Sequence, residues 1–206
     1  MRLYHTCGVV CGVAVALTVT VRARATTVLF AGTGHYYELV EDKGITWLEA
    51  KAAAEAMAHD GMPGYLATIT SAAENQFLMD HILGGYSDGE PYFIGGLQPP
   101  GSGEPGGGWQ WLTGEPWSYT NWKTRTGEPN DLDDGPLYPH EDRLEIYDDE
   151  VHYGQWNDIH HDRPRQGYIV EFNPVPEPLT LLGIGAGIAA LGGYVRGRGS
   201  RSRKRK

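Results

Sequence analysis

The sequence predicts an α+β fold for the central part of the chain. Two capping boxes, Thr46-Trp47-Leu48-Glu49 and Ser71-Ala72-Ala73-Glu74, each begin a stretch with the apolar spacing of a helix. Short strand-like runs follow them, and residues 98–108 and 113–142 are loops rich in Gly, Pro, Asp and Asn. Two early helices followed by short strands and long loops are typical of an α+β domain.

Each predicted helix has one apolar face. The first helix runs to about His59, and the residues that share its buried face at helical spacing are Trp47, Ala50, Ala54 and Met57. The second directs Phe77, Leu78 and Ile82 toward the core and ends at Gly84-Gly85, because glycine readily adopts the left-handed conformation that ends a helix. One strand is expected before the helices, at residues 36–40, and five after them, at 92–97, 109–112, 143–147, 152–156 and 167–172.

Residues 1–25 are expected to be a secretory signal peptide. Arg2 gives a positive start, residues 9–21 are almost all apolar or small, and Ala23-Arg24-Ala25 matches a cleavage pattern. A membrane anchor is the alternative, although this apolar run is short for a bilayer span. The folded domain is therefore expected at residues 26–173.

Residues 174–206 consist of three parts. Val175-Pro176-Glu177-Pro178 is followed by an uncharged segment at 179–195 and then by a tail rich in Arg and Lys, which is expected to stay cytoplasmic. This order resembles the PEP-CTERM sorting signal of exported bacterial proteins, which implies recognition by an exosortase and removal of the membrane segment. A permanent tail anchor is the alternative. Either way we expect an exported protein, at the cell surface or outside it, that contacts the membrane at least transiently.

The net charge of −9 conceals a more acidic domain. Residues 26–173 carry 7 of the 17 basic residues and 25 of the 26 acidic ones, a balance of −18. Such a charge argues against nucleic acid as a ligand and suits the binding of cations.

A series of short motifs runs through the domain in a fixed order. They are Trp47-x-x-Ala50, the run 66–75, Phe93-Ile94-Gly95-Gly96-Leu97, Trp109-Gln110-Trp111, Gly114-Glu115-Pro116, Tyr119-Thr120-Asn121-Trp122, Glu128-Pro129-Asn130, Glu141-Asp142, Trp156-Asn157-Asp158 and the run 168–171. Over residues 34–172 this order resembles the C-type lectin-like domain. The resemblance implies a fold of two helices, small antiparallel sheets and a long loop region.

The resemblance also implies a calcium site that binds sugar directly. Its ligands would be carboxylate and amide oxygens, which Ca²⁺ prefers, from Glu128, Asn130, Glu141, Asn157 and Asp158. Two vicinal sugar hydroxyls would replace water on the ion and hydrogen-bond to the same side chains. The Glu-Pro-Asn order resembles the type that selects mannose, glucose or fucose, and the ligand would be a saccharide or exopolysaccharide.

Four further residues would have supporting roles. Pro129 would be the cis proline that turns Glu128 and Asn130 to the same side. Trp156 would belong to the core, and Asp131 and Asp142 would help to hold an auxiliary calcium ion.

The chain departs from the family pattern in two ways. Both cysteines, Cys7 and Cys11, lie in the expected signal peptide, and the half-cystine positions hold Ala54, Arg143, His161 and Val170, which implies a disulfide-free variant. Each missing disulfide would stabilise the fold by about 2–4 kcal/mol, so core packing or calcium must offset the loss. The segment 130–141 is also longer than the common pattern, and Asp133 or Asp134 could take the place of Glu141.

The sequence leaves alternatives to sugar binding. The main one is a calcium-stabilised surface domain that binds a protein partner, because a fold does not fix a function. The histidines His140, His152, His160 and His161 suggest a zinc site, but the adjacent rings of 160 and 161 would point to opposite faces of a strand. Paired carboxylates could serve glycoside hydrolysis, but no Walker loop or zinc-protease motif is present, and we do not expect an enzyme.

Overall fold

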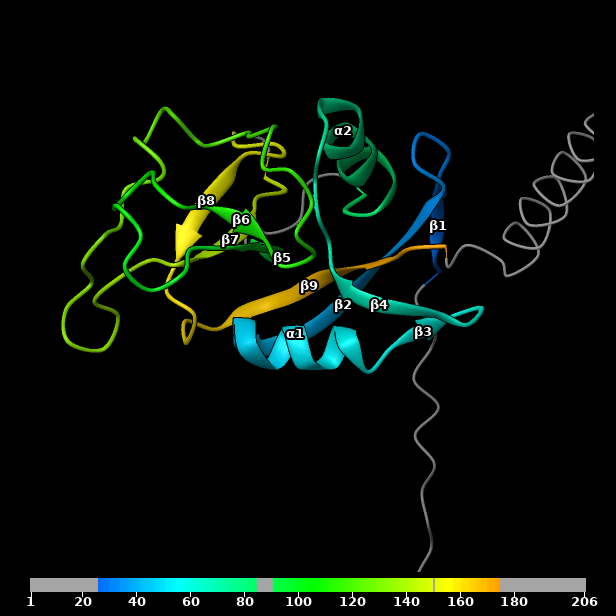
Figure 1. Ribbon diagram of the computed structural model, residues 1–206, viewed down its shortest axis with the longest axis horizontal. Helices are drawn as coiled ribbons and strands as arrows, with labels where there is room; N and C mark the ends of the chain where they lie inside the picture. The colour runs from blue at the N-terminus through cyan, green and yellow to red at the C-terminus, as the bar shows by residue number, and fades with distance from the viewer. Residues whose placement is uncertain (1–25, 85–90, 150, 175–206) are drawn as a thin grey trace, which may run out of the picture.

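The computed structural model describes residues 26–84, 91–149 and 151–174 (Figure 1). In this part of the chain the helices are α1 (Trp47–Glu55) and α2 (Ala72–His81). The strands there are β1 (Val28–Phe30), β2 (His35–Ile45), β3 (Ala58–His59), β4 (Met62–Leu66), β5 (Tyr92–Leu97), β6 (Gln110–Trp111), β7 (Arg143–Ile146), β8 (Trp156–Ile159) and β9 (Arg165–Phe172). The α+β class expected from the sequence is confirmed.

Strand β9 is the centre of the sheet. It pairs antiparallel with β2 and β4, and parallel with β5 where Phe93 lies opposite Tyr168. Strand β5 pairs with β6 and β7, and β7 pairs with β8, all antiparallel. In Figure 1 the long loops between residues 98 and 142 gather at the β7–β8 end of the molecule, away from β1 and the end of β9.

Two cores lie on opposite sides of β9. Val170 and Phe172 pack with Trp47 of α1, whereas Ile169 packs with Leu78 of α2. Successive residues of a strand point to opposite faces, so α1 and α2 cover different faces of the sheet, as Figure 1 shows. Of the predicted apolar faces, Trp47, Ala50, Ala54, Leu78 and Ile82 are buried, and Met57 and Phe77 are partly buried against the cores.

The first helix is shorter than predicted. It ends at Glu55, and a hairpin formed by β3 and β4 replaces its expected last turn. The hairpin turns at Asp60 and Gly61, whose φ angles of 48° and 81° are left-handed. An Asp-Gly pair adopts such a two-residue turn with little strain, and this signal outweighs the helical spacing that extended to Met57.

The predicted strand at 152–156 is also wrong. Strand β8 begins at Trp156, and the preceding residues form a turn. The carboxylate of Asp149 holds this turn by accepting hydrogen bonds from the N–H groups of Val151, at 2.8 Å, and His152, at 2.7 Å. An aspartate that bonds the backbone a few residues ahead is a turn signal, and it decides the structure here.

Other contacts fill the space where the family resemblance places disulfides. Ala54 and Val170 are fully buried in one core, and a Cβ on Gly64 would lie 2.6 Å from the Ala54 carbonyl oxygen. At the second pair of positions, Asp142 bridges Arg143, at 3.0 Å, and His161, at 3.1 Å. Dense packing therefore occupies the first pair of positions, and a polar cluster around Asp142 occupies the second.

Both terminal segments lie outside the described residues. They include the expected signal peptide at 1–25 and the expected PEP-CTERM signal with its membrane segment at 179–195. Within the described ranges, no helix combines the length and the hydropathy needed to cross a bilayer.

Candidate functional site

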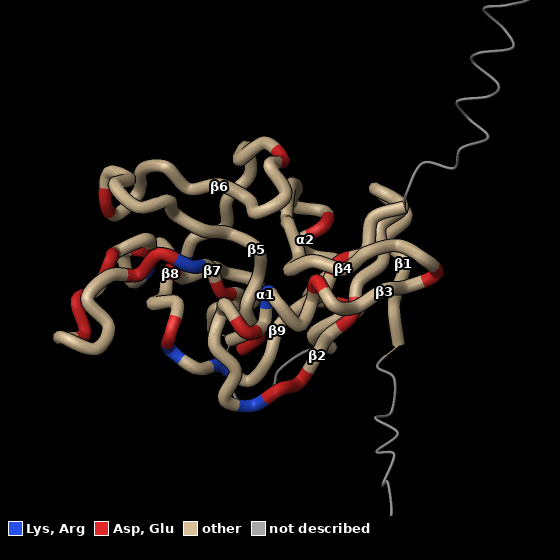
Figure 2. Tube along the Cα trace, turned by 60° about the horizontal axis from the view of Figure 1, so that its bottom comes forward, with Lys and Arg blue, Asp and Glu red and all other residues tan. Residues whose placement is uncertain are grey.

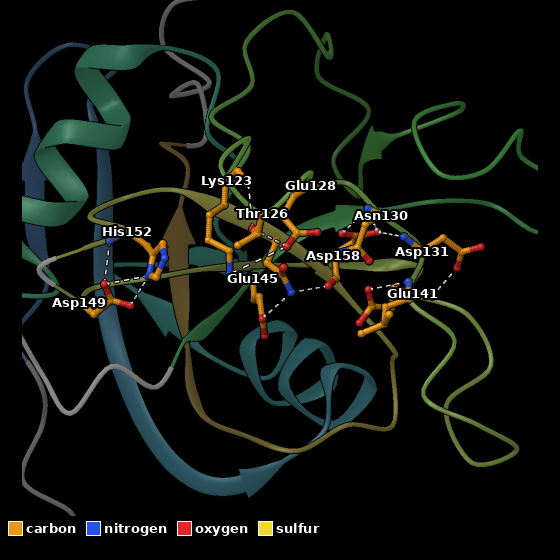
Figure 3. Close-up of polar contacts among 12 residues, drawn as sticks. Lys123, Thr126, Glu128, Asn130, Asp131, Glu141, Glu145, Asp149, His152 and Asp158 are labelled. Atoms are coloured by element: carbon orange, nitrogen blue, oxygen red, sulfur yellow. Dashed lines mark hydrogen bonds and ion pairs between the residues drawn. The ribbon is translucent and has the colours of Figure 1, made fainter.

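Asp158 holds the turn that follows Glu128 and Pro129 (Figure 3). It is fully buried on β8, and its carboxylate accepts hydrogen bonds from the N–H of Asn130, at 3.0 and 3.1 Å, and of Asp131, at 2.8 Å. The Glu128–Pro129 peptide is cis, as the resemblance implies. Two of the predicted motifs, far apart in the sequence, therefore meet at one place.

Glu141 reaches the same region from the far end of the long loop. Its Oε2 accepts a hydrogen bond from the N–H of Leu132 at 3.0 Å, and its own N–H donates to Oδ1 of Asp131 at 2.9 Å. These two bonds close the loop at its base. Glu141 is consequently only 5% exposed, and its charge interacts with that of Asp158 despite the length of the loop.

Asn157 and Glu145 form a pair across β8 and β7. Nδ2 of Asn157 donates to Oε1 of Glu145 at 3.0 Å and lies 2.5 Å from the carbonyl oxygen of Asp158. Glu145 is fully buried and forms an ion pair with Arg165 of β9. A half-turn of the Asn157 amide would exchange its nitrogen and oxygen. The amide oxygen would then face two acceptors, the Glu145 carboxylate and the Asp158 carbonyl oxygen, so a cation would have to stabilise that arrangement.

Glu128 is buried with one oxygen unpartnered. Its Oε1 accepts a hydrogen bond from the hydroxyl of Thr126 at 2.8 Å and lies 3.9 Å from Nζ of Lys123. Its Oε2 has no hydrogen-bond partner among the described residues. A buried polar atom without a partner costs about 1–3 kcal/mol, so this oxygen fits a position that binds a cation or a donor.

The carboxylates of this site shift one another's pKa. Burial raises the pKa of Glu141 to about 8, and the charges of Asp158, Glu145 and Glu128 add to the shift. Burial likewise raises the pKa of Asp158 to about 6, with a contribution from Glu128. Figure 2 shows several Asp and Glu along the loops beside β7 and β8. A divalent cation among these groups would favour their ionised forms and reverse both shifts.

The predicted ligands are neighbours but do not surround one point. Among the described residues, two groups bring three His, Asp or Glu ligand atoms within 4.8 Å of one another, namely His160-His161-Asp162 and His35-Glu74-Glu171. Glu128, Glu141 and Asp158 do not form such a group. Like charges repel, so their oxygens would have to move inward around an ion. Asn130 is exposed and can take part in such a movement.

The other acidic residues of the loop have different partners. The Asp131 carboxylate lies near His140, at 3.3 Å, in addition to the Glu141 N–H, whereas the Asp142 carboxylate is engaged by Arg143 and His161. An auxiliary calcium ion between the two stays a prediction. Asp133 and Asp134 are both exposed; the first accepts a hydrogen bond from Gly135 and the second pairs with Arg163. Glu141, by contrast, is buried and its charge interacts with that of Asp158.

The four candidate zinc histidines are only partly together. His140 lies beside Asp131 and His152 beside Asp149, each in its own pair. His160 and His161 follow β8, and their rings stack with centroids 4.1 Å apart. The expectation that these rings point to opposite faces is wrong, because the chain leaves the strand at Ile159 and turns.

Sequence reasoning missed Glu145, Lys123 and Arg165. Their role depends on strand register, which places Glu145 opposite Asn157, and on a bridge that places Trp122 beside Trp156. The only sequence signal was a charged residue inside the apolar run 144–146, which is unusual for a buried strand unless the charge is paired.

The family of the chain is shown by a match to a family model. The model described as the lectin C-type domain matches residues 45–166. Halomucin of Haloquadratum walsbyi is 31% identical over 142 residues, which are 68% of this chain and 1% of halomucin. The 30 kDa spicule matrix protein of Hemicentrotus pulcherrimus is 32% identical over 111 residues, 53% of this chain and 37% of that protein. The chain thus spans much less than two thirds of either relative.

Solved structures share the fold. The cow C-type carbohydrate-recognition domain of CD23, crystallised in the presence of GlcNAc2Man3 oligosaccharide, is 22% identical with a TM-score of 0.55, covering 75% of this chain and 98% of that one. The carbohydrate-recognition domain of the mouse scavenger receptor C-type lectin is 25% identical with a TM-score of 0.52, covering 74% of this chain and 97% of that one.

Proposed function

Because the chain belongs to the C-type lectin domain family, we propose that it binds saccharides of the mannose, glucose or fucose type through a calcium ion. The ion would be held by Glu128, Asn130, Glu141, Asn157 and Asp158. The bound ion would supply a Lewis-acidic centre on which two vicinal hydroxyls replace water.

One observation supports this proposal most. The site concentrates buried carboxylates whose pKa values are raised to about 8 for Glu141 and about 6 for Asp158, and it leaves Oε2 of Glu128 without a partner among the described residues. The nearby cations do not pair with that oxygen: Lys123 lies near Oε1 of Glu128, and Arg165 pairs with Glu145. A hard divalent cation with oxygen ligands would relieve both the repulsion and the unpartnered oxygen.

The side chains of the turn would also recognise the sugar. A carboxylate of Glu128 can only accept hydrogen bonds, whereas the amide of Asn130 can also donate one. The cis Glu128–Pro129 peptide precedes the turn that Asp158 holds through two backbone N–H groups. An acceptor and a donor at fixed positions favour one arrangement of hydroxyls over another, which is the basis of the proposed selectivity.

The paired exchange Glu128→Gln with Asn130→Asp tests the selectivity. It keeps the size of both side chains and reverses which of them carries the charge. We expect binding of mannose to fall and binding of galactose to rise, measured by calorimetry in millimolar Ca²⁺ and again in EGTA. Unchanged selectivity, or equal binding in EGTA, would contradict the proposal. The matched control Glu55→Gln alters an exposed acid of α1 that pairs with Lys51.

A protein partner is the second candidate. Leu132 and Leu137, in the loop beside the site, are 52% and 76% exposed. Exposed leucines next to a rigid loop base suit an apolar contact. If this candidate is right, Leu137→Asn abolishes partner binding and the paired exchange at 128 and 130 has no effect. Oligosaccharides should be bound without turnover, and release of new reducing ends would contradict a binding role.

We also propose that the protein is exported and sorted through its C-terminal segment. The order Val175-Pro176-Glu177-Pro178, apolar segment and basic tail supports this. The relatives include a protein named for the spicule matrix, so an extracellular matrix glycan is a suitable ligand class. Mass spectrometry of the mature protein tests the proposal: we expect termini near Thr26 and near the Pro-Glu-Pro motif, and an intact tail would indicate a permanent anchor.

A further inference from the structure

Three consecutive residues after β8 bring two imidazoles and a carboxylate together. The ligand atoms of His160, His161 and Asp162 all lie within 4.8 Å of one another. His160 is buried, His161 is partly buried and Asp162 is exposed, so one side of the group is open to solvent. The proposed calcium-and-sugar function uses none of the three.

His161 is oriented as metal-binding histidines usually are. Its Nδ1 lies 3.1 Å from a carboxylate oxygen of Asp142, which fixes the proton on Nδ1 and leaves the lone pair on Nε2. A carboxylate that accepts from the other ring nitrogen is the common outer partner of a zinc-bound histidine. Nε2 of His161 lies 3.6 Å from Oδ2 of Asp162, a spacing that two ligands of one ion can adopt.

The group is also fixed to the long loop of the candidate lectin site. The ring of Tyr138 packs edge-on against His160, with centroids 5.3 Å apart. Arg163 lies over the same Tyr138 ring at 5.4 Å and pairs with Asp134. Ordering His160 would therefore order the part of the loop that contains Tyr138.

We propose that His160, His161 and Asp162 bind one transition-metal dication, with Asp142 as the outer partner, and that the ion fixes residues 131–142 against the end of β8. Two imidazoles and one carboxylate match the ligand preference of Zn²⁺, and solvent can supply the fourth ligand. The ion would replace the hydrogen bond that the N–H of Asp162 donates to Nδ1 of His160 at 3.1 Å. Ca²⁺ and Mg²⁺ prefer oxygen ligands and fit this group poorly. The site is distinct from the proposed calcium site and requires no sugar.

Zinc binding by the full-length protein, without a polyhistidine tag, tests the proposal. ZnCl₂ is titrated by calorimetry in excess CaCl₂, so that calcium occupies the oxygen-rich site. We expect one Zn²⁺ per chain. Loss of an outer partner typically weakens metal binding by about 10–100-fold. His161 and Asp162 are proposed as direct ligands, so His161→Gln and Asp162→Asn should each weaken zinc binding at least as much. His152→Gln is the matched control, because His152 also pairs with an aspartate but belongs to neither three-ligand group of the described residues.

A second measurement guards against variants that misfold. Co²⁺ in place of Zn²⁺ should give the visible absorption of a low-symmetry nitrogen and oxygen site, and the band should vanish in His161→Gln while far-UV circular dichroism stays unchanged. Absence of stoichiometric binding, or equal affinity in wild type and His161→Gln, would overturn the proposal. So would a loss confined to His35→Gln, which would place the ion at His35-Glu74-Glu171. Calcium-dependent sugar binding, measured separately on the same variants without zinc, reports on the lectin function.

Discussion

Calcium binding should release about one proton at pH 7. Burial raises the pKa of Glu141 to about 8, so about nine-tenths of the metal-free protein carries this proton at pH 7. Asp158, with a pKa of about 6, contributes about one-tenth. Calcium binds the ionised carboxylates, so both fractions must leave together.

The affinity should therefore depend on pH in a defined way. Between about pH 6 and pH 8 the association constant should rise about tenfold per pH unit, because the slope equals the number of protons released. Above about pH 8 the slope should fall toward zero. Calorimetry in buffers of different ionisation enthalpy measures the released protons directly.

Two variants separate this reasoning from a general loss of calcium affinity. Glu141→Gln should lower the release at pH 7 to about one-tenth of a proton, because only Asp158 still titrates. Glu55→Gln, an exposed control on α1, should leave the slope unchanged. A wild-type affinity that does not vary between pH 6 and pH 8 would refute the claim that Glu141 is a buried ligand of the ion.

Three further predictions concern stability. Calcium at 100 times its dissociation constant should stabilise the fold by about 2.7 kcal/mol, and an equal melting temperature in EGTA would contradict the site. The metal-free protein should lose stability as the pH rises from about 4.5 through about 8, because the folded-state pKa of Glu141 lies above its ordinary value and protonation favours the folded state. The hydrogen bond to Glu171 raises the pKa of His35, and this shift lowers the stability in the same pH direction. The part of the stability loss that disappears in the Glu141→Gln variant therefore belongs to Glu141. Trp156→Ala should cost about 3–5 kcal/mol in urea unfolding, because the fully buried indole also donates to Oδ1 of Asn75 at 2.9 Å, and a cost under about 1 kcal/mol would contradict its place in the core.

The fold was predictable wherever a local signal agreed with the tertiary structure. Ser71 caps α2 by accepting from the N–H of Glu74 at 3.2 Å, as its capping box predicts. The carboxylate of Glu74, however, bonds the N–H of Thr70 at 2.7 Å and the hydroxyl of Tyr37, not Ser71. A contact with Tyr37, from a distant strand, cannot be seen in a four-residue motif.

The motifs predict which residues meet in the candidate region, but not the electrostatics there. Glu128, Asn130, Glu141, Asn157 and Asp158 were all named from the sequence, and the structure brings them to one region. The burial of Glu141 follows from the closure of the loop by Asp131 and Leu132, which no spacing rule gives. The pairing of Glu145 with Arg165 depends on the order of strands in the sheet, which is set by the whole chain.

The absence of the two disulfides that are usual in the family is a physical reason for this site to depend on ions. A disulfide between positions 143 and 161 would hold β7 to the turn after β8 without regard to pH or metal. Here the Asp142 carboxylate, which pairs with the adjacent Arg143, reaches across to His161 through a hydrogen bond of 3.1 Å, and such contacts near the surface contribute about 0–1 kcal/mol each. The covalent bond is thus replaced by polar side chains, of which His161 is a ligand of the proposed zinc site and Asp142 its outer partner. Binding at either site would stabilise the contact between the two segments that these side chains hold only weakly. The two metals should therefore increase each other's affinity, and calorimetry of one metal in the presence of the other measures that coupling.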